Sequence, residues 1–289
     1  MIVFATAGKS NSFKGKYPHD LPEHLESYGL NGFEVQCGRG VNVSDEVCDL
    51  FTELTNADRL HLSLHAPYFI SLSSVELDTR EKSIGYILES ARIAKRIGAK
   101  RIVVHSGSCA KISREVALGY SLKTLKKARA ILDEEGLSQI MICPETMGKV
   151  NQLGTLEEVI ELCSFDERML PCIDFGHLNA RTFGGLKGRG DYATIFEAIQ
   201  DKLGSERLKQ IHVHFSKIEY TVPKIGSKST GGGEKKHLTF DDCGEFGPDY
   251  EPFLEEVAKR QLQPFIVCES NGTQAEDCAV MKKYWQAQV

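Results

Sequence analysis

Residues 101–145 read RIVVHSGSCAKISREVALGYSLKTLKKARAILDEEGLSQIMICPE and carry the clearest indication of the fold. The stretch begins with the apolar run Arg101–Ser106, continues with helical periodicity over 113–135, and ends with a second apolar run, Gln139–Glu145. Runs this apolar are typical of parallel strands covered on both faces, and a helix commonly joins two such strands. The stretch therefore predicts a β-α-β unit.

The same alternation runs through the rest of the chain. Short runs rich in Val, Ile, Leu, Phe or Cys predict six more strands, at Ile2–Ala7, Gly32–Gln36, His61–Ala66, Leu170–Phe175, Gln210–Phe215 and Pro264–Glu269. Helical patterns lie between them, for example at 78–97, 191–203, 248–260 and 271–288, and Thr155-Leu156-Glu157-Glu158 predicts a capping box. Eight strand–helix units in 289 residues, about 36 residues each, favour a single α/β domain over 1–289, a (β/α)₈ TIM barrel, over an open doubly wound sheet.

Composition narrows the class of protein. The chain is 41% hydrophobic and 26% charged, which is too apolar for a disordered protein. No apolar run approaches the ~20 residues that a membrane span needs, and the first residues lack the basic leader of a signal peptide. The net charge of −5 argues against broad nonspecific binding of nucleic acid. We expect a cytoplasmic monomer with no membrane partner.

One connection departs from the pattern. Residues 216–249 have no clear helical period and contain Gly231-Gly232-Gly233. A structureless stretch of this length inside a compact domain is usually functional or disordered. Its first part is rich in lysine, with Lys217, Lys224, Lys228, Lys235 and Lys236 against Glu219 and Glu234. We expect a long basic loop beside the active site.

Metal-ligating side chains follow six consecutive predicted strands at their C-terminal ends, where catalytic residues of this fold lie. In chain order they are His65, His105, Glu145, Asp174 with His177, His214 and Glu269, and His237 follows in the long loop. Imidazole and carboxylate ligands suit Zn²⁺ or Mn²⁺, and the set exceeds the coordination of one ion. A single histidine or a capping Asp174 would be ordinary, but six successive strand ends predict a metal centre. We expect His212 to face the opposite side of the sheet from His214 and to be structural.

At these residues the sequence resembles the endonuclease IV family. The members of that family are apurinic/apyrimidinic endonucleases of DNA base excision repair and are built on a TIM barrel. The resemblance implies a trinuclear zinc cluster and hydrolysis of the phosphodiester 5′ to an abasic nucleotide by a metal-activated hydroxide. It implies that two or three zinc ions, or manganese in their place, are bound. His65 and His105 resemble ligands of the first metal, and Glu145 resembles a bridge to the second. The other implied ligands are Asp174, His214 and Glu269 for the second metal and His177 and His237 for the third, and the implied catalytic residues are Glu145 and Glu269.

The long loop departs from this family. Family members usually present Asp-x-His there, but this chain has Glu234-Lys235-Lys236-His237, with Lys235 at the place of the aspartate. Because a protonated lysine cannot bind a metal, the third site is predicted to be weak, absent, or completed by Glu234 or water.

The resemblance also implies damaged double-stranded DNA as the partner. Arg39 and the pair Tyr68-Phe69 match positions from which the family contacts the lesion, where inserting a side chain costs least because a base is missing. The loop lysines Lys217, Lys235 and Lys236 are further candidates for DNA contact. Tyr68 and Phe69 fit a simple cover over the barrel mouth equally well, and Arg39 fits any surface loop.

Two other functions stay open. A manganese-dependent sugar isomerase or epimerase of the xylose-isomerase-like barrels needs only Glu145, Asp174, His214 and Glu269, which leaves four histidines unused. A non-catalytic, metal-stabilised nucleic-acid binding protein would not need a nearly complete hydrolytic ligand set. Phosphodiester hydrolysis accounts for more of the residues than either alternative.

Overall fold

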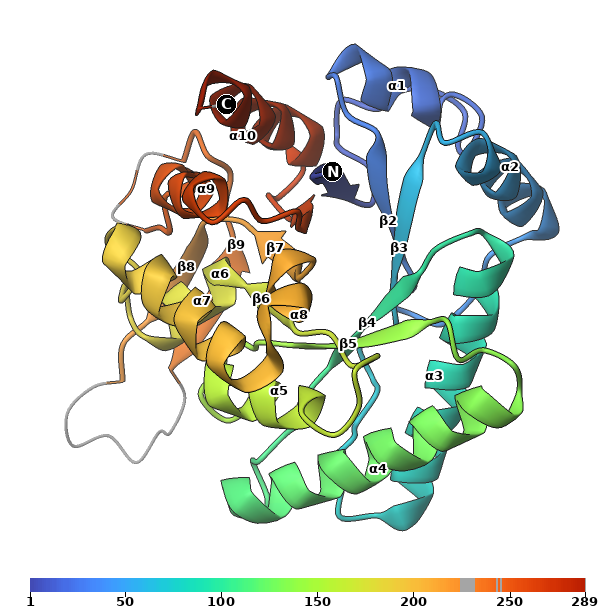
Figure 1. The fold of residues 1–289 in the computed structure, drawn as a ribbon, viewed down its shortest axis with the longest axis vertical. Helices are drawn as coiled ribbons and strands as arrows, with labels where there is room; N and C mark the ends of the chain where they lie inside the picture. The colour runs from blue at the N-terminus through green and yellow to red at the C-terminus, as the bar shows by residue number, and fades with distance from the viewer. Residues whose placement is uncertain (224–231, 243, 245, 289) are drawn as a thin grey trace.

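Eight short strands close into a parallel barrel in the computed structural model of the chain (Figure 1). The structure describes residues 1–223, 232–242, 244 and 246–288. The barrel strands are β1 (Val3–Ala7), β2 (Gly32–Gln36), β3 (His61–His65), β4 (Arg101–His105), β5 (Met141–Glu145), β6 (Cys172–Asp174), β7 (His212–Phe215) and β10 (Phe265–Cys268). They are ordered β1-β10-β7-β6-β5-β4-β3-β2, so each strand neighbours the next barrel strand along the chain, and β10 returns to β1. The predicted TIM barrel and all eight of its strands are confirmed.

Helices cover the outside of the barrel (Figure 1). They are α1 (Leu21–Ser27), α2 (Asp45–Asn56), α3 (Leu77–Arg96), α4 (Arg114–Glu134), α5 (Leu156–Cys163), α6 (Phe175–Arg181), α7 (Arg189–Leu203), α8 (Ser205–Lys209), α9 (Tyr250–Lys259) and α10 (Gln274–Gln288). Ser44, Ser113 and Thr155 cap α2, α4 and α5 through their hydroxyl groups, and the capping box predicted at Thr155 is confirmed. Among the described residues no helix has the length and apolarity to cross a membrane.

Side chains alternate between the barrel interior and the layer under the helices, and β7 shows this clearly. Val213 and Phe215 pack in the large core shared with the helices, whereas His212 and His214 both contact Glu34 across the barrel interior. The prediction that His212 faces away from His214 is therefore wrong. Successive residues of a strand alternate, so residues two apart point to the same side.

The described part of the connection after β7 contains two strands that its sequence did not indicate. Strands β8 (Ile218–Thr221) and β9 (Gly233–His237) pair as an antiparallel sheet that lies against α6. The register shifts within this pair: Lys236 lies opposite Glu219 and Glu234 lies opposite Tyr220, which leaves Lys235 as the extra residue of a β-bulge. The expected loop at 216–249 thus contains a hairpin. Its residues 224–231, 243 and 245, which include Lys224 and Lys228, lie outside the described part of the chain.

Candidate metal centre

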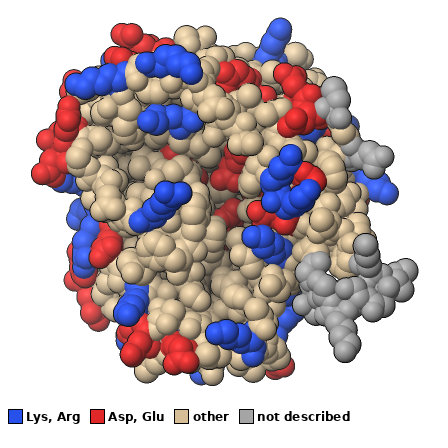
Figure 2. Space-filling view, turned by 180° about the vertical axis from the view of Figure 1, so that it is seen from behind, with Lys and Arg blue, Asp and Glu red and all other residues tan. Residues whose placement is uncertain are grey.

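The C-terminal ends of the barrel strands open into a cavity of about 420 Å³. Its lining includes His65, His105, Glu145, His177 and Glu269. Figure 2 shows one face of the molecule hollowed near its middle, with acidic side chains deep in the hollow and lysine and arginine side chains around it. The cavity therefore has imidazole and carboxylate groups that could bind a metal, and lysine and arginine side chains lie on the face around it.

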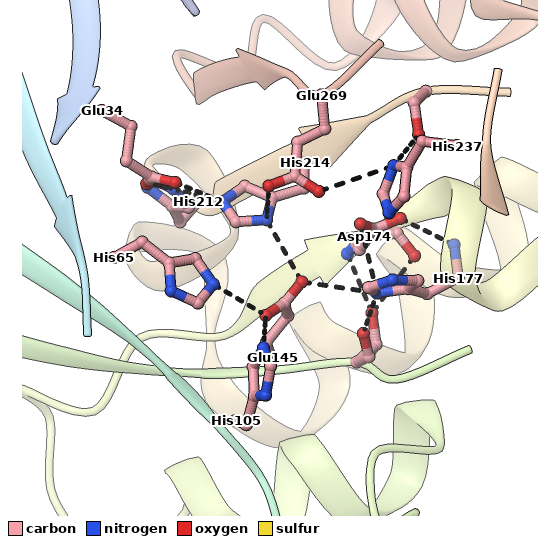
Figure 3. Close-up of polar contacts among 12 residues, drawn as sticks. Glu34, His65, His105, Glu145, Asp174, His177, His212, His214, His237 and Glu269 are labelled. Carbon is pink, nitrogen blue, oxygen red and sulfur yellow. Dashed lines mark hydrogen bonds and ion pairs between the residues drawn. The ribbon is translucent and has the colours of Figure 1, made fainter. Parts of the chain in front are cut away.

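Glu145, the last residue of β5, lies at the centre of the histidines (Figure 3). One of its oxygens, Oε2, lies 3.4 Å from His65 Nε2 and 3.5 Å from His105 Nε2. The other, Oε1, lies 3.2 Å from His214 Nδ1 and 3.3 Å from His177 Nδ1. The two oxygens thus face different imidazoles, so each oxygen could bind a separate cation.

A second group of donor atoms combines Glu145 with Asp174, His214 and Glu269, all of which lie close enough to hold one ion. His214 Nδ1 lies 3.3 Å from Glu269 Oε1. Asp174 caps α6, because its Oδ1 accepts a hydrogen bond of 2.7 Å from the backbone N–H of His177. Its Oδ2 has no hydrogen-bond partner among the described residues, and its ion-pair neighbour is His177 Nδ1 at 3.2 Å. Asp174 is thus both the predicted cap and a carboxylate with an oxygen left for a ligand.

The third group contains His177, His237 and Glu234. His177 Nε2 lies 3.5 Å from Glu234 Oε2, and the two histidine rings are 5.6 Å apart. Gly148 makes room for this contact, since a Cβ atom there would lie 2.5 Å from Cβ of Glu234. Lys235 points elsewhere, with its Nζ 2.5 Å from Glu219 Oε1. The bulge at Lys235 lets Glu234 join His237 on the side of β9 that faces His177, in place of the lysine.

The histidines are held through their other ring nitrogens. A carbonyl can only accept a hydrogen bond, so an Nδ1 atom that contacts one must carry a proton, and in the neutral imidazole Nε2 is then a lone pair. These anchors are Ala66 O at 2.8 Å for His65, Thr146 O at 2.9 Å for His177 and, through a hydroxyl, Ser216 Oγ at 2.8 Å for His237. Such anchoring is usual for histidines that bind metals.

Divalent cations fit these donors. Glu145 Oε2 and Asp174 Oδ2 are buried and lack hydrogen-bond partners in the described chain, which is costly for a carboxylate unless a cation is bound. Burial would raise the pKa of Glu145, but the imidazoles of His214, His177 and His65 hold that pKa well below its usual value. Burial lowers the pKa of His105 to about 4, so this imidazole is neutral and offers a lone pair.

Of the two aromatic candidates for DNA contact, Tyr68 lines the cavity, and Phe69 follows it in the chain. Tyr68 and Phe69 are 54% and 49% exposed. Tyr68 stacks on His105 with ring centres 5.4 Å apart, and its hydroxyl donates to Gln36 Oε1. Phe69 packs edge-on against Tyr86.

The basic candidates for DNA contact are Arg39 and three lysines near β8 and β9. Arg39 is exposed in the turn after β2. Lys217 Nζ donates to the Phe240 carbonyl, and Lys235 and Lys236 both contact Glu219. Their contact with DNA stays a prediction.

Of two carboxylates of this region, Glu234 was named from the sequence as one possible completion of the third site, and Glu34 was not named. Glu234 was considered only as a substitute ligand, and no local pattern indicated the bulge that brings it to His177. Glu34 was not singled out at all, although an acidic residue within the apolar strand GFEVQ is a signal that could have identified it. It lies fully buried beside His214 (Figure 3).

Comparisons with known proteins agree with this fold. A family model described as xylose isomerase-like TIM barrel matches residues 22–284. An uncharacterised protein of Methanocaldococcus jannaschii is 29% identical over 284 residues, which cover 98% of this chain and 97% of that protein. A probable endonuclease 4 of Oceanobacillus iheyensis is 27% identical over 256 residues, which cover 84% of this chain and 82% of that protein.

Two solved structures match almost the whole chain. Endonuclease IV from Thermus thermophilus has a TM-score of 0.63 and 22% identity, covering 99% of this chain and 97% of its own. A D-tagatose 3-epimerase-like protein has a TM-score of 0.71 and 18% identity, covering 99% and 98%. At these identities the two matches show the shared fold.

Proposed function

Since the chain belongs to the xylose isomerase-like TIM barrel family, we propose that it is a metal-dependent phosphodiesterase of the endonuclease IV type that cleaves DNA 5′ to abasic sites. The observation that carries the proposal is the arrangement of histidines around Glu145. His65 and His105 face one of its oxygens, and His177 with His237 forms a further group. The relatives named probable endonuclease 4 support the same activity.

The three groups would hold two or three zinc or manganese ions. His65, His105 and Glu145 would hold the first, and Glu145, Asp174, His214 and Glu269 the second. Bound cations would lower the pKa of a water molecule and neutralise negative charge on the phosphate oxygens during in-line attack.

The protein's own residues orient this chemistry. Glu145 keeps the first two groups together, because its two oxygens face opposite ways. Burial raises the pKa of the Glu269 carboxyl, and Glu269 Oε2 faces His237 at 4.0 Å while Oε1 faces His214. Glu269 thus reaches both the second and third groups and is placed to orient the nucleophile. Tyr68 and Phe69, which are exposed, would enter the gap left by a missing base.

We also propose that Glu234 replaces the family's aspartate at the third site. The Glu234→Gln variant should lose one bound ion per chain, because the amide is a poorer ligand than the carboxylate. Lys235→Gln is the matched control, since it changes the adjacent residue of β9 and leaves the third group intact. Metal analysis of both purified proteins checks this, and an unchanged count in Glu234→Gln would remove Glu234 from the site.

A sugar epimerase is the second candidate, favoured by one specific observation. Glu145, Asp174, His214 and Glu269 form a complete group by themselves, as a single-metal epimerase would need. That function leaves His65, His105 and the third group without a role.

Incision of a duplex with one abasic analogue tests the proposal. Protein loaded with zinc or manganese should cut the lesion strand 5′ to the analogue and leave an undamaged duplex intact. Glu145→Gln and Glu269→Gln should lose activity by more than about a hundredfold. Even residues that only hydrogen-bond to a metal ligand change metal affinity or activity by roughly ten- to a hundredfold when they are mutated. Glu157→Gln, a residue of α5 outside the three donor groups, is the matched control. An intact abasic duplex together with epimerisation of a ketose, or with binding alone, would overturn the proposal.

A further inference from the structure

A second buried polar group lies in the barrel interior, on the side of His214 that faces away from Glu145 and Glu269 (Figure 3). At its centre is Glu34, in the middle of β2, whose side chain is fully buried. No sequence pattern assigned this residue a role. Because β2 and β7 are not neighbours in the barrel, Glu34 reaches His214 across the interior rather than along the sheet.

Four potential donors converge on the Glu34 carboxylate. Its Oε2 lies 3.0 Å from His212 Nε2 and accepts a hydrogen bond of 2.9 Å from Ser63 Oγ. Its Oε1 lies 3.2 Å from His214 Nε2 and accepts a hydrogen bond of 3.1 Å from Gln36 Nε2. An ionised carboxylate has only acceptor sites, so each imidazole donates to Glu34 only in the tautomer that carries the proton on Nε2. The two Nε2 atoms also lie 3.2 Å from each other, and of the two neutral tautomers of His214 only the one protonated on Nε2 donates to Glu34.

This arrangement determines what His214 offers on its other side. Its Nδ1 lies 3.2 Å from Glu145 Oε1 and 3.3 Å from Glu269 Oε1, within the second donor group. A neutral imidazole that donates from one nitrogen presents a lone pair at the other. His212 stabilises the same arrangement, since its Nε2 contacts Glu34 Oε2 and its ring stacks on Phe265 with ring centres 5.3 Å apart.

We infer that Glu34 is a positioning residue of the metal centre: it accepts the Nε2 proton of His214 and thereby directs the Nδ1 lone pair toward the bound cation. This inference rests on the metal centre of the proposed function, but not on its DNA substrate. Carboxylates that accept a hydrogen bond from a metal-binding histidine fix its tautomer and ring orientation, and increase its basicity.

Zinc affinity, measured by competition with a chelator in the full-length protein, tests this role. Glu34→Gln keeps the size of the side chain but removes its charge, and its amide can donate to Nε2 and favour the wrong tautomer. Its affinity at the most affected site should fall by roughly ten- to a hundredfold. Ser63→Ala is the matched control, because it removes a hydrogen bond to the same carboxylate without touching His214, and it should keep the affinity of the wild type.

A measurement on the wild type keeps the inference testable even where Glu34→Gln does not fold. Nitrogen-15 NMR of the zinc-loaded protein should show His214 bound through Nδ1 and protonated on Nε2. A proton on Nδ1, or equal zinc affinity in Glu34→Gln and wild type, overturns the role of Glu34. If the zinc affinity depends on Glu34 but the protein leaves an abasic duplex intact, the role of Glu34 stands and only the proposed DNA substrate is overturned. A wild type that binds no zinc or manganese would overturn both.

Discussion

Glu145 and Glu158 are two carboxylates withdrawn from solvent on successive elements, β5 and α5, yet their surroundings are opposite in kind. Glu158 is paired in bidentate fashion with Arg114, at 2.8 and 2.7 Å, and also accepts backbone N–H groups of Gly154 and Thr155. Glu145 is surrounded by imidazoles, and its Oε2 has no hydrogen-bond partner in the described residues.

The difference distinguishes a polar group that stabilises the fold from a polar group that still lacks a partner. The Arg114–Glu158 pair is complete within the chain: the guanidinium also donates to the carbonyls of Val150 and Gln152. Such a satisfied pair ties α4, α5 and the loop after β5 together and needs no further partner. The Glu145 group leaves two buried carboxylate oxygens, Glu145 Oε2 and Asp174 Oδ2, without a hydrogen-bond partner in the described residues, an arrangement that natural proteins retain mainly where a ligand completes it.

The largest effect that distinguishes these regions is expected on removal of divalent cations. A chelator should abolish incision and lower the free energy of unfolding by about 4 kcal/mol, if the cation had been present at ~1,000 times its dissociation constant. Thermal unfolding with and without the chelator measures this. Adding back zinc or manganese should restore the melting temperature of the untreated protein. Identical melting curves for loaded and stripped protein would contradict a cation-dependent centre.

Breaking the complete pair should have a smaller effect of a different kind. Arg114→Ala should lower the free energy of unfolding by about 2 kcal/mol, because it leaves Glu158 and two carbonyls without their donor while the partly exposed site admits water. The number of ions bound per chain should not change. Denaturant unfolding and metal analysis of the same preparation check both statements. A variant that loses an ion but keeps its stability would show that Arg114 supports metal binding rather than the fold.

The same variant has an expected pH dependence. Burial would raise the pKa of Glu158, but Arg114 and the backbone donors hold it below its usual value. A lowered folded-state pKa stabilises the protein above the unfolded pKa, near ~4.3, and this contribution is lost as the pH falls through the folded value. The stability difference between wild type and Arg114→Ala should therefore be full at neutral pH and decrease below about pH 4. Denaturant unfolding of both proteins across this range checks the direction, and a difference that grows on acidification would contradict it.

The contrast also explains which features could be read from the sequence. The eight strands were predictable because parallel strands buried on both faces are apolar runs, and His65, His105 and His214 were predictable as residues near the ends of such runs. The hairpin β8–β9 was missed because GEKKH has little of the composition typical of strands. Its bulge is a property of pairing with β8, which the local sequence does not encode.

Contacts across the barrel were the least predictable. Glu34 meets His212 and His214 only because the barrel closes β2 and β7 around one interior, and residues so far apart in the chain share no local pattern. For His212 the information was present in the sequence: the period of a strand places it on the same side as His214, and applying that period would have given the observed orientation.

The smallest expected effect concerns the cap that adjoins the Arg114–Glu158 pair. Thr155 Oγ1 accepts the backbone N–H of Glu158 at 3.2 Å, while Glu158 Oε2 accepts the backbone N–H of Thr155 at 3.0 Å. Thr155→Ala removes the first of these bonds and should lower the free energy of unfolding by about 1 kcal/mol. Because Arg114 still holds Glu158, the loss should stay below that of Arg114→Ala, and the double variant should depart from the sum of the two losses, since both residues hold Glu158. Denaturant unfolding of the two single variants and the double variant measures this coupling, and strict additivity would show that the cap and the ion pair act independently.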